Sequence, residues 1–292
     1  MSKANSVIGV DLGGTKILAG IVDANGVVHE TTEQPTVTTS QDALLDEIAA
    51  AVRTLPAEGV SAVGFGVPSR IDQRTGIALG AVNIPLHEVD FRGEMARRLG
   101  LPVVVENDAG AAAYGEFRLG AGRGTRDLVM LTLGTGVGGG VVIGGSLFHG
   151  WAELGHMVIV ADGEPCQGSC TGRGHVESYC SGSAAERLAR RELGPNGTAR
   201  ELVRLRHASL AGIGHLLGVA IGTLVNVFNP QAVVIGGGFG VAAFELLVPA
   251  ARDALLVEAL APAGGELELR PAELGATAGL IGAGLLALEI DR

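Results

Sequence analysis

The chain has 292 residues, of which 47% are hydrophobic and 18% charged, with a formal net charge of −10 at pH 7. This composition excludes a disordered chain, and the negative charge argues against a nucleic-acid-binding surface. The length allows one large domain or two lobes. Three cysteines without a secretory signal favour a reducing compartment. We therefore expect a cytoplasmic protein that contacts neither nucleic acid nor membrane, with its most apolar segment, 213–228, forming a buried helix.

The first predicted elements form a β-hairpin with a glycine-rich turn. Strands are expected at 6–12 and 17–22, joined by Gly13-Gly14-Thr15-Lys16. A Walker A loop would require Gly-Lys-Thr followed by a helix, so that motif is excluded. The glycines let phosphate oxygens approach the backbone, Thr15 and Lys16 can donate to them, and Asp11 can hold a water on Mg²⁺. A plain glycine hairpin with an incidental aspartate is the alternative.

A polar triplet, Glu106-Asn107-Asp108, follows the predicted strand 102–105. Earlier elements are a helix at 42–55, a strand at 61–67 and a helix at 91–99. Open α/β sheets bind ligands at the carboxyl ends of their strands. A carboxylate there can take the proton of an attacking hydroxyl, so Asp108 is the candidate base, and Asn107 can fix neighbouring hydroxyls. The alternative is that both residues only cap a helix that begins at Ala109.

A second glycine run, 134–140, follows a predicted strand at 127–133. Its first six residues match G-x-G-x-x-G, but a dinucleotide-binding loop must open a helix, and a strand-like run follows here. We interpret Gly134, Thr135 and Gly136 as a second phosphate-binding hairpin. Strand, glycines and strand thus occur twice, about 120 residues apart, as a duplicated two-lobed nucleotide clamp would show.

The segment from Glu153 to Glu177 gathers potential metal ligands. Two thiols and two imidazoles can complete a tetrahedral zinc shell with no position left for a catalytic water, so the predicted metal is structural. These ligands are His156, Cys166, Cys170 and His175. The flanking carboxylates of Glu153 and Glu177 suit vicinal hydroxyls of a substrate. The alternative is buried thiols and surface histidines; Cys180 is read as a core thiol.

The rest of the chain alternates helices and strands. Helices are predicted at 184–192, with Ser183 as N-cap, and at 199–206, 210–228, 245–261 and 278–289; strands are predicted at 232–235 and 266–271. The strand at 232–235 ends in Gly236-Gly237-Gly238. This third glycine cluster either lies against a ligand or is a plain strand-to-helix turn.

Several of these motifs resemble those of the ROK family (repressors, open reading frames and sugar kinases). The resemblance includes the D-x-G-G-T-K turn from Asp11, the E-N-D-A run from Glu106, E-L-G-H at 153–156 and G-R-G-H-V-E at 172–177. Two extra residues separate Cys166 from Cys170, His175 stands at the usual third cysteine, and Gly110 replaces the usual Asn. The resemblance implies an α/β fold, the two-lobed actin-like ATPase (ribonuclease H-like) fold with an interlobe cleft.

The resemblance also implies domains and roles. The N-terminal lobe would be 1–109, rejoined by 278–292, and the C-terminal lobe 110–277 with the zinc loop 153–177. An ATP-dependent hexose kinase is expected, most of all a glucokinase, with Mg²⁺ and structural Zn²⁺. Kinases for N-acetylmannosamine, N-acetylglucosamine, fructose or mannose, and a non-catalytic sugar-binding regulator, are the alternatives. Only ten residues precede Asp11, which disfavours a repressor.

Within that resemblance, several residues carry a substrate role. Sugar contacts are assigned to Ser69, Asn83, Asn107, Asp108, Glu153, His156 and Glu177. Ser69 and Asn83 are equally suited to turns. Gly236, Gly237 and Gly238 would lie against the adenosine. A homodimer or homotetramer is implied.

Overall fold

A computed structural model describes residues 6–290 of the chain, which divide into two compact units. Unit 1 contains the chain up to Leu119, the short segment His149–Trp151 and the chain from Ala276 onward. Unit 2 contains Gly120–Phe148 and Ala152–Gly275. The boundary placed at residue 109 from the sequence falls inside a helix, and the units divide about ten residues later.

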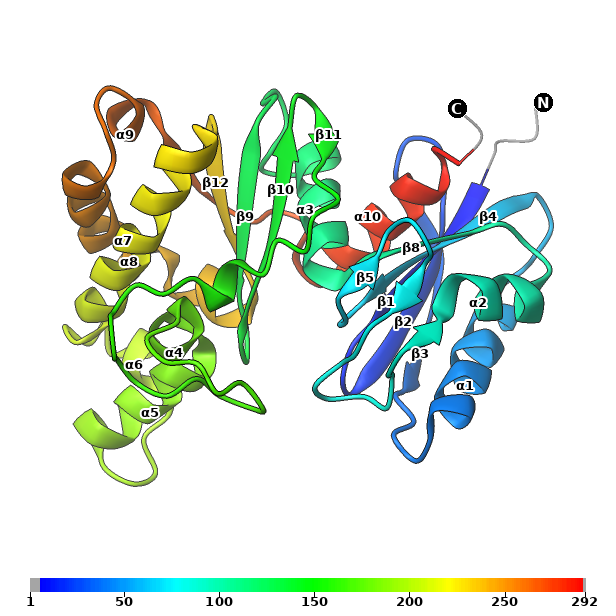
Figure 1. Cartoon of the computed structure of the whole chain (residues 1–292), viewed down its shortest axis with the longest axis horizontal. Helices are drawn as coiled ribbons and strands as arrows, with labels where there is room; N and C mark the ends of the chain where they lie inside the picture. The colour runs from blue at the N-terminus through cyan, green and yellow to red at the C-terminus, as the bar shows by residue number, and fades with distance from the viewer. Residues whose placement is uncertain (1–5, 291–292) are drawn as a thin grey trace. The chain divides into compact units, whose positions relative to one another are not determined.

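Unit 1 is built on a five-stranded mixed sheet (Figure 1). Its strands, in spatial order, are β3 (Val28–Pro35), β2 (Lys16–Val22), β1 (Ser6–Leu12), β4 (Val60–Val67) and β8 (Val103–Asn107). β1 and β2 pair in antiparallel fashion, as the predicted hairpin requires, whereas β1, β4 and β8 are parallel. The carboxyl ends of β1, β4 and β8 therefore share one edge of the sheet.

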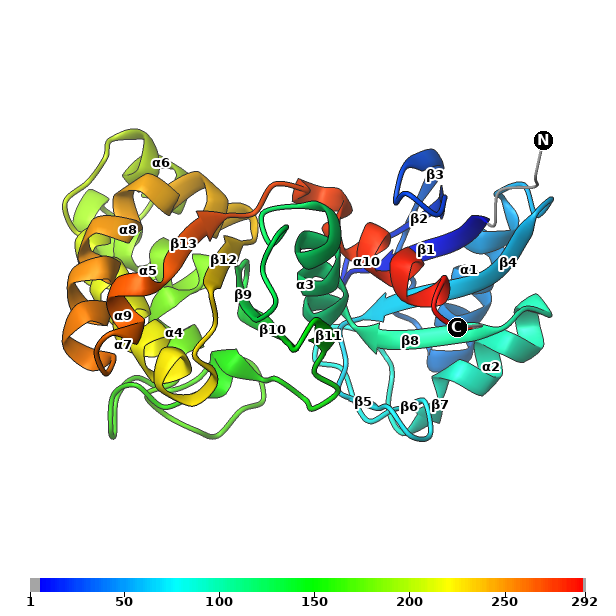
Figure 2. The same ribbon diagram turned by 90° about the horizontal axis from the view of Figure 1, so that it is seen from above.

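Helices cover both faces of the unit 1 sheet. α1 (Gln41–Arg53) and α2 (Phe91–Leu99) bury Leu44 and Phe91 in one core with the strands. On the opposite face lie α10 (Ala278–Ala287) and α3 (Asp108–Leu119) (Figures 1 and 2). A Cβ at Gly9 would stand 2.0 Å from the Leu280 carbonyl oxygen of α10. Glycine on the strand thus lets this helix pack directly on the sheet.

A second, three-stranded sheet in unit 1 was not predicted. It consists of β5 (Ile71–Asp72), β6 (Ile77–Ala78) and β7 (Val89–Asp90), all antiparallel. Strands of two residues are too short to show a period-two pattern in the sequence. This small sheet folds the chain after β4 back toward the start of α2.

Unit 2 repeats the topology of unit 1. Its sheet contains, in spatial order, β11 (Ser146–Leu147), β10 (Val137–Ile143), β9 (Leu128–Leu133), β12 (Ala232–Gly236) and β13 (Glu268–Pro271). β9 and β10 are antiparallel, and β9, β12 and β13 are parallel. The sheets thus share both strand order and strand direction, which is the duplication suggested by the two strand–glycine–strand repeats.

Helices pack on the unit 2 sheet around a core that contains Leu131, Leu217 and Leu247 (Figure 1). They are η1 (Leu154–His156), α4 (Val176–Cys180), α5 (Gly182–Leu193), α6 (Ala199–Arg204), α7 (Leu210–Phe228), α8 (Gly238–Glu258) and α9 (Ala263–Glu266), and η2 (Gly275–Thr277) then leads into α10. By length and composition alone, α7 passes as a membrane span, and among residues 6–290 it is the single such helix. Ten of its residues are buried in the core, as the sequence predicts.

Three predicted elements of unit 2 were misplaced. Ser181, not Ser183, is the N-cap of α5, because its Oγ accepts a hydrogen bond from the Ala184 amide. α8 begins at Gly238 rather than at 245, because Gly237 turns the chain directly into the helix. The predicted strand at 266–271 begins two residues later, since α9 occupies the chain up to Glu266.

Candidate active site

The first group of predicted site residues lies in unit 1, at the edge where β1, β4 and β8 end. Asp11 pairs with Gly66 of β4, and Gly66 pairs with Glu106 of β8. A Cβ at Gly66 would stand 3.4 Å from the Cα of Asp108. Glycine on β4 thus lets the first turn of α3, which carries Asp108, pack closely on the strand next to the one that carries Asp11.

Asp11 has a strongly perturbed acidity. Burial, and next the charge of Asp108, raise the pKa of Asp11 from 3.8 to about 7, although Lys16 lowers it. Its carboxyl group lies against the first turn of α10, where a Cβ at Gly279 would be 2.8 Å from Asp11 Cγ. Two carboxyl groups held together at low solvent exposure favour either a bound proton or a cation. This edge is therefore suited to a divalent metal.

The predicted phosphate turn forms beside Asp11. The Gly13 amide donates to the Lys16 carbonyl (2.8 Å), and Thr36 Oγ1 donates to the Gly13 carbonyl (2.7 Å). Lys16 Nζ forms an exposed ion pair with Glu33 at 2.7 Å, so it would have to leave that partner to reach a phosphate.

Asn83 lies close to the same turn, since a Cβ at Gly14 would be 3.3 Å from the Asn83 Cβ. The structure thus brings Asn83 to this turn.

Asn107 and Asp108 cap α3, as the alternative interpretation held. Asn107 Oδ1 accepts from the amides of Ala109 and Gly110 (2.9 and 3.1 Å), and Asp108 Oδ1 accepts from the Ala109 amide (2.9 Å). Capping does not exclude a ligand role. Asn107 Nδ2 donates to the Ser69 carbonyl at 3.3 Å, and an amide nitrogen has a second hydrogen to donate. The caps fix the direction in which both side chains project.

Ser69 shows the turn chemistry named as its alternative. Its side chain is 4% exposed, and its Oγ donates to the Gly80 carbonyl (3.0 Å) and accepts from the Gly80 amide (3.2 Å). These bonds tie the segment after β4 to the segment after β6. The Ser69 carbonyl, rather than the hydroxyl, faces Asn107.

Glu106 and His149 were missed as site residues. Glu106 is 6% exposed; its Oε1 accepts from the Asn107 amide (2.8 Å), and its Oε2 accepts from Gln73 (2.8 Å). His149 Nδ1 lies 3.5 Å from Glu106 Oε2, and this contact raises the pKa of His149 despite partial burial. Since His149 is 43 residues away from Glu106 along the chain, only tertiary structure could reveal the contact.

The second group of site residues lies in unit 2, at the turn between β9 and β10. The Gly134 amide donates to the Gly136 carbonyl (3.0 Å). The third glycine cluster lies against this turn, because a Cβ at Gly237 would be 2.5 Å from the Leu133 carbonyl oxygen. Gly237 precedes the 21-residue helix α8, whose amino end favours anions. The two glycine clusters therefore lie next to each other, and Gly236–Gly238 is also the strand-to-helix turn of the alternative interpretation.

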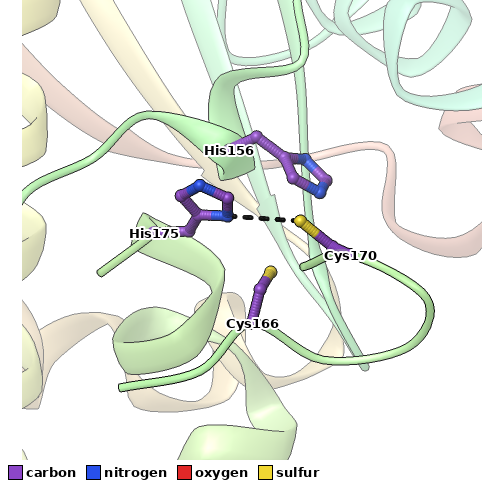
Figure 3. Close-up of side chains that lie close together, drawn as sticks. All are labelled: His156, Cys166, Cys170 and His175. Atoms are coloured by element: carbon purple, nitrogen blue, oxygen red, sulfur yellow. Dashed lines mark hydrogen bonds between the residues drawn. The ribbon is translucent and has the colours of Figure 1, made fainter. Parts of the chain in front are cut away.

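The four predicted metal ligands converge in unit 2 (Figure 3). One potential ligand atom from each of His156, Cys166, Cys170 and His175 lies within 4.8 Å of the others, and Cys170 Sγ is 3.7 Å from His175 Nδ1. Tetrahedral zinc with bonds of about 2.3 Å to sulfur and about 2.0 Å to nitrogen would hold its ligand atoms roughly 3.5 Å apart. The donor set and its spacing thus fit zinc.

The surroundings of the thiols also fit a cation. Burial, followed by the neighbouring Cys170, raises the pKa of Cys166 to about 11, and Glu177 adds to the effect. A bound divalent ion reverses this unfavourable crowding of negative groups. Cys180 is fully buried in the unit 2 core, apart from the ligand set, and burial raises its pKa to about 12. It is a core thiol, as the sequence indicates.

The two flanking carboxylates differ in their partners. Glu153 and His156 are exposed, and Glu153 Oε2 lies 3.6 Å from His156 Nδ1, an arrangement in which Nε2 would be the ring nitrogen suited to bind a metal. Glu177 is more enclosed: its Oε2 accepts from the Val137 amide at 2.9 Å, and its Oε1 is 3.8 Å from Cys166 Sγ. Glu177 therefore stands between the metal ligands and the second glycine turn.

Comparison with known proteins assigns the chain to a family. The ROK family model matches residues 7–290. The chain belongs to the ROK family. A glucokinase of Streptomyces coelicolor is 35% identical, covering 97% of this chain and 98% of its own length. A xylose repressor of Bacillus spizizenii is 28% identical, covering 98% of this chain and 78% of its own length.

A solved ROK structure extends the likeness to three dimensions. The crystal structure of a ROK glucokinase from Streptomyces griseus, in complex with glucose and AMPPNP, is 34% identical, with a TM-score of 0.84 over 97% of this chain and 99% of that one. The predicted fold class, α/β of the actin-like ATPase type, is therefore confirmed, as is the ROK resemblance. The interlobe cleft stays a prediction.

Proposed function

We propose that this ROK protein is an ATP-dependent hexose kinase that phosphorylates the 6-hydroxyl of glucose. The observation that carries the proposal is the pair of carboxyl groups of Asp11 and Asp108, at the ends of parallel strands beside a glycine turn. Full-length similarity to a glucokinase gives the substrate class. Phosphoryl transfer to an alcohol requires a base, a divalent cation and backbone donors, and unit 1 offers groups suited to all three.

In the proposed mechanism, Asp108 accepts the proton of the sugar 6-hydroxyl. The oxygen then attacks the γ-phosphorus of ATP, the bond from that phosphorus to the bridging oxygen breaks, and ADP leaves. Asp11 would hold Mg²⁺ through water, and the ion would neutralise charge developing on the phosphates. Gly13, Gly14, Thr15 and Lys16 are suited to contact phosphate oxygens through backbone and side-chain donors.

We propose the following ligand contacts in addition. For the hexose they are Ser69, Asn83, Asn107, Asp108, Glu153, His156 and Glu177; for ATP they are Gly134, Thr135, Gly136, Gly236, Gly237 and Gly238. For Ser69 the carbonyl is the group proposed, since the hydroxyl already binds Gly80. The hydrogen bonds that direct Asn107 and the amino end of α8 beside Gly237 support these roles.

We also propose that His156, Cys166, Cys170 and His175 bind one structural Zn²⁺. Their convergence and mixed sulfur–nitrogen donor set support it. The ion would order the segment 153–177, whose only regular structure is η1 and the first residues of α4. The homodimer or homotetramer and the cytoplasmic location stay predictions.

The same kinase assay distinguishes two alternative functions. Kinases for N-acetylmannosamine, N-acetylglucosamine, fructose or mannose would use the same base. A non-catalytic sugar-binding regulator is favoured by the similarity to a xylose repressor. A regulator would bind sugar without consuming ATP.

The deciding experiment is a coupled ADP-release screen over about a dozen hexoses, with total zinc measured on the same preparation. We expect glucose-dependent ADP release and about one zinc per chain. Asp108→Asn should lower kcat by several orders of magnitude and change sugar affinity little, because only the base is lost. A variant that keeps a tenth of the wild-type rate would rule out Asp108 as the base.

A further inference from the structure

The metal-binding segment makes a direct contact with the second glycine turn through Gln167. This residue follows the ligand Cys166 and belongs to the stretch Gln167-Gly168-Ser169, which is two residues longer than the ROK motif has between its cysteines. Gln167 Nε2 donates to the Thr135 carbonyl at 3.1 Å. The metal-binding segment thus places a donor against the turn between β9 and β10.

The contact with Gln167 sets the direction of a peptide group. Among residues 6–290 the single cis bond is Ala261–Pro262, so the peptide between Thr135 and Gly136 is trans and planar. In a trans peptide the carbonyl and the N–H point in opposite directions. Holding the Thr135 carbonyl on Gln167 therefore aims the Gly136 N–H away from the metal-binding segment.

The preceding peptide of the turn is held in the same way. The Gly182 amide, at the start of α5, donates to the Gly134 carbonyl at 2.7 Å. By the same geometry, the Thr135 N–H points away from α5. Two consecutive amide donors are thus oriented by partners behind them, and consecutive oriented N–H groups are what a phosphate-binding turn requires.

The turn needs such external support because of its own residues. Gly134 and Gly136 carry no side chain, so their backbone is free to take many conformations. A Cβ at Gly136 would stand 2.1 Å from Glu177 Oε2, so a larger residue there would have to displace that carboxylate. Glu177 fixes the far end of the turn at the Val137 amide, which leaves the centre of the turn to Gln167.

We propose that Gln167 is a positioning residue for nucleotide binding: it links the metal-binding segment to the Gly134–Gly136 turn and aims the Gly136 N–H at the phosphates of ATP. The inference rests on the proposed kinase function, since it assumes that this turn binds phosphate. It goes beyond that function by assigning to the metal-binding segment a role toward ATP, separate from its role toward the sugar.

The test compares Gln167→Met with Ser169→Ala in the zinc-loaded protein. Met has nearly the size of Gln but no donor, and Ser169 is an exposed residue of the same stretch. Calorimetric titration with a non-hydrolysable ATP analogue should show about three- to tenfold weaker binding for Gln167→Met, the range that corresponds to one hydrogen bond. Glucose affinity should change less than twofold, and Ser169→Ala should match the wild type in both.

Two further measurements separate positioning from general damage. In steady-state kinetics, Gln167→Met should raise the KM for ATP but leave the KM for glucose unchanged, whereas Gln167→Lys, which keeps a donor, should restore ATP binding at least in part. Hydrogen exchange of a peptide spanning 134–137 should accelerate in Gln167→Met, with β9 unaffected.

The proposal is overturned if Gln167→Met binds the ATP analogue within twofold of the wild type. It is also overturned if glucose affinity falls by the same factor as nucleotide affinity. Failure of the proposed function gives a different result, because the wild-type protein itself would then not bind the ATP analogue. Exchange in 134–137 still reports on the Gln167 contact in that case, and unchanged exchange in Gln167→Met would contradict it.

Discussion

Asp11→Asn should make the ligand-free protein more stable while abolishing kinase activity. The wild-type carboxylate is held in a mostly buried place beside Asp108, and burial raises its pKa to about 7. At alkaline pH this carboxyl group is charged in both states, but the charge is buried only in the folded protein, which destabilises the folded state relative to the unfolded chain. Asparagine has nearly the same shape and no charge, so the substitution removes that cost.

The size of the expected gain in stability follows from the rise in the pKa of Asp11. The rise from 3.8 to about 7 is about three pKa units at about 1.4 kcal/mol each, or about 4 kcal/mol as an upper value. Because Asp11 keeps some solvent contact and lies near Lys16, we expect about 2–4 kcal/mol at pH 8.5. Since the folded pKa is raised, protonation favours folding, so the stability contributed by this group falls as pH rises from about 4 to about 7. The gain from Asp11→Asn should therefore be about half as large at pH 5.5.

Thermal unfolding of the metal-free protein at pH 5.5 and 8.5 measures this difference. At pH 8.5 the variant should melt roughly 5–10 °C above the wild type, and the gap should narrow at pH 5.5. Asp23→Asn is a control with the opposite expected effect on stability. Although burial raises the pKa of Asp23, hydrogen bonds from His29 and from the amides of Val27 and Asn25 lower it overall, so this substitution should lower the melting temperature. An Asp11→Asn protein that melts at or below the wild-type temperature at pH 8.5, or a gap independent of pH, would refute the reasoning.

Four further substitutions test the packing, the backbone and the contact between His149 and Glu106. Gly282→Ala should destabilise by about 3 kcal/mol or more, because its Cβ would lie 1.7 Å from the Ala111 carbonyl oxygen, whereas Gly212→Ala, with open space around it, should stabilise α7 by up to about 1 kcal/mol in denaturant titrations. Ala152→Gly should gain about 0.5–1 kcal/mol in the same titrations, because Ala152 has φ 47°, and a loss would contradict the left-handed backbone there. His149→Gln should lower Tm more at pH 6 than at pH 8.5, because the raised pKa of His149 makes its bond to Glu106 stabilising below about pH 6.5 and lost as pH rises through the folded value; equal losses at both pH values would exclude it.

Much of the fold follows from local patterns in the sequence. The sequence predicted three elements to within about one residue: the first hairpin, with strands at 6–12 and 17–22, the helix at 91–99 and the buried helix at 210–228. These predictions succeeded because apolar periodicity and glycine-rich turns are local signals. The two-residue strands β5 to β7 and the start of α8 at Gly238 were not predicted. Those strands exist only because partners pair with them, and glycines at a helix start carry no helical pattern.

For the candidate site, too, some features could be predicted from local sequence and others depended on tertiary contacts. Residue types and spacing predicted that His156, Cys166, Cys170 and His175 could share a metal, and the structure brings these four side chains together. The sequence likewise ranked Asp108 as a base and Asp11 as a metal holder. It could not show that Asn107 caps α3 and faces the Ser69 carbonyl, or that Glu106 binds His149.

The sequence by itself therefore determined which functional groups the chain carries, namely its carboxylates, thiols, imidazoles and glycines, and the local helices, strands and turns that contain them. The tertiary structure decided which of these groups interact. The close packing of α3 on β4 at Gly66, which brings Asp108 near Asp11, and the hydrogen bond from Gln167 to Thr135 both join segments that are far apart in the chain. Contacts of that kind leave no local pattern, because burial and charge coupling arise only when distant segments pack together.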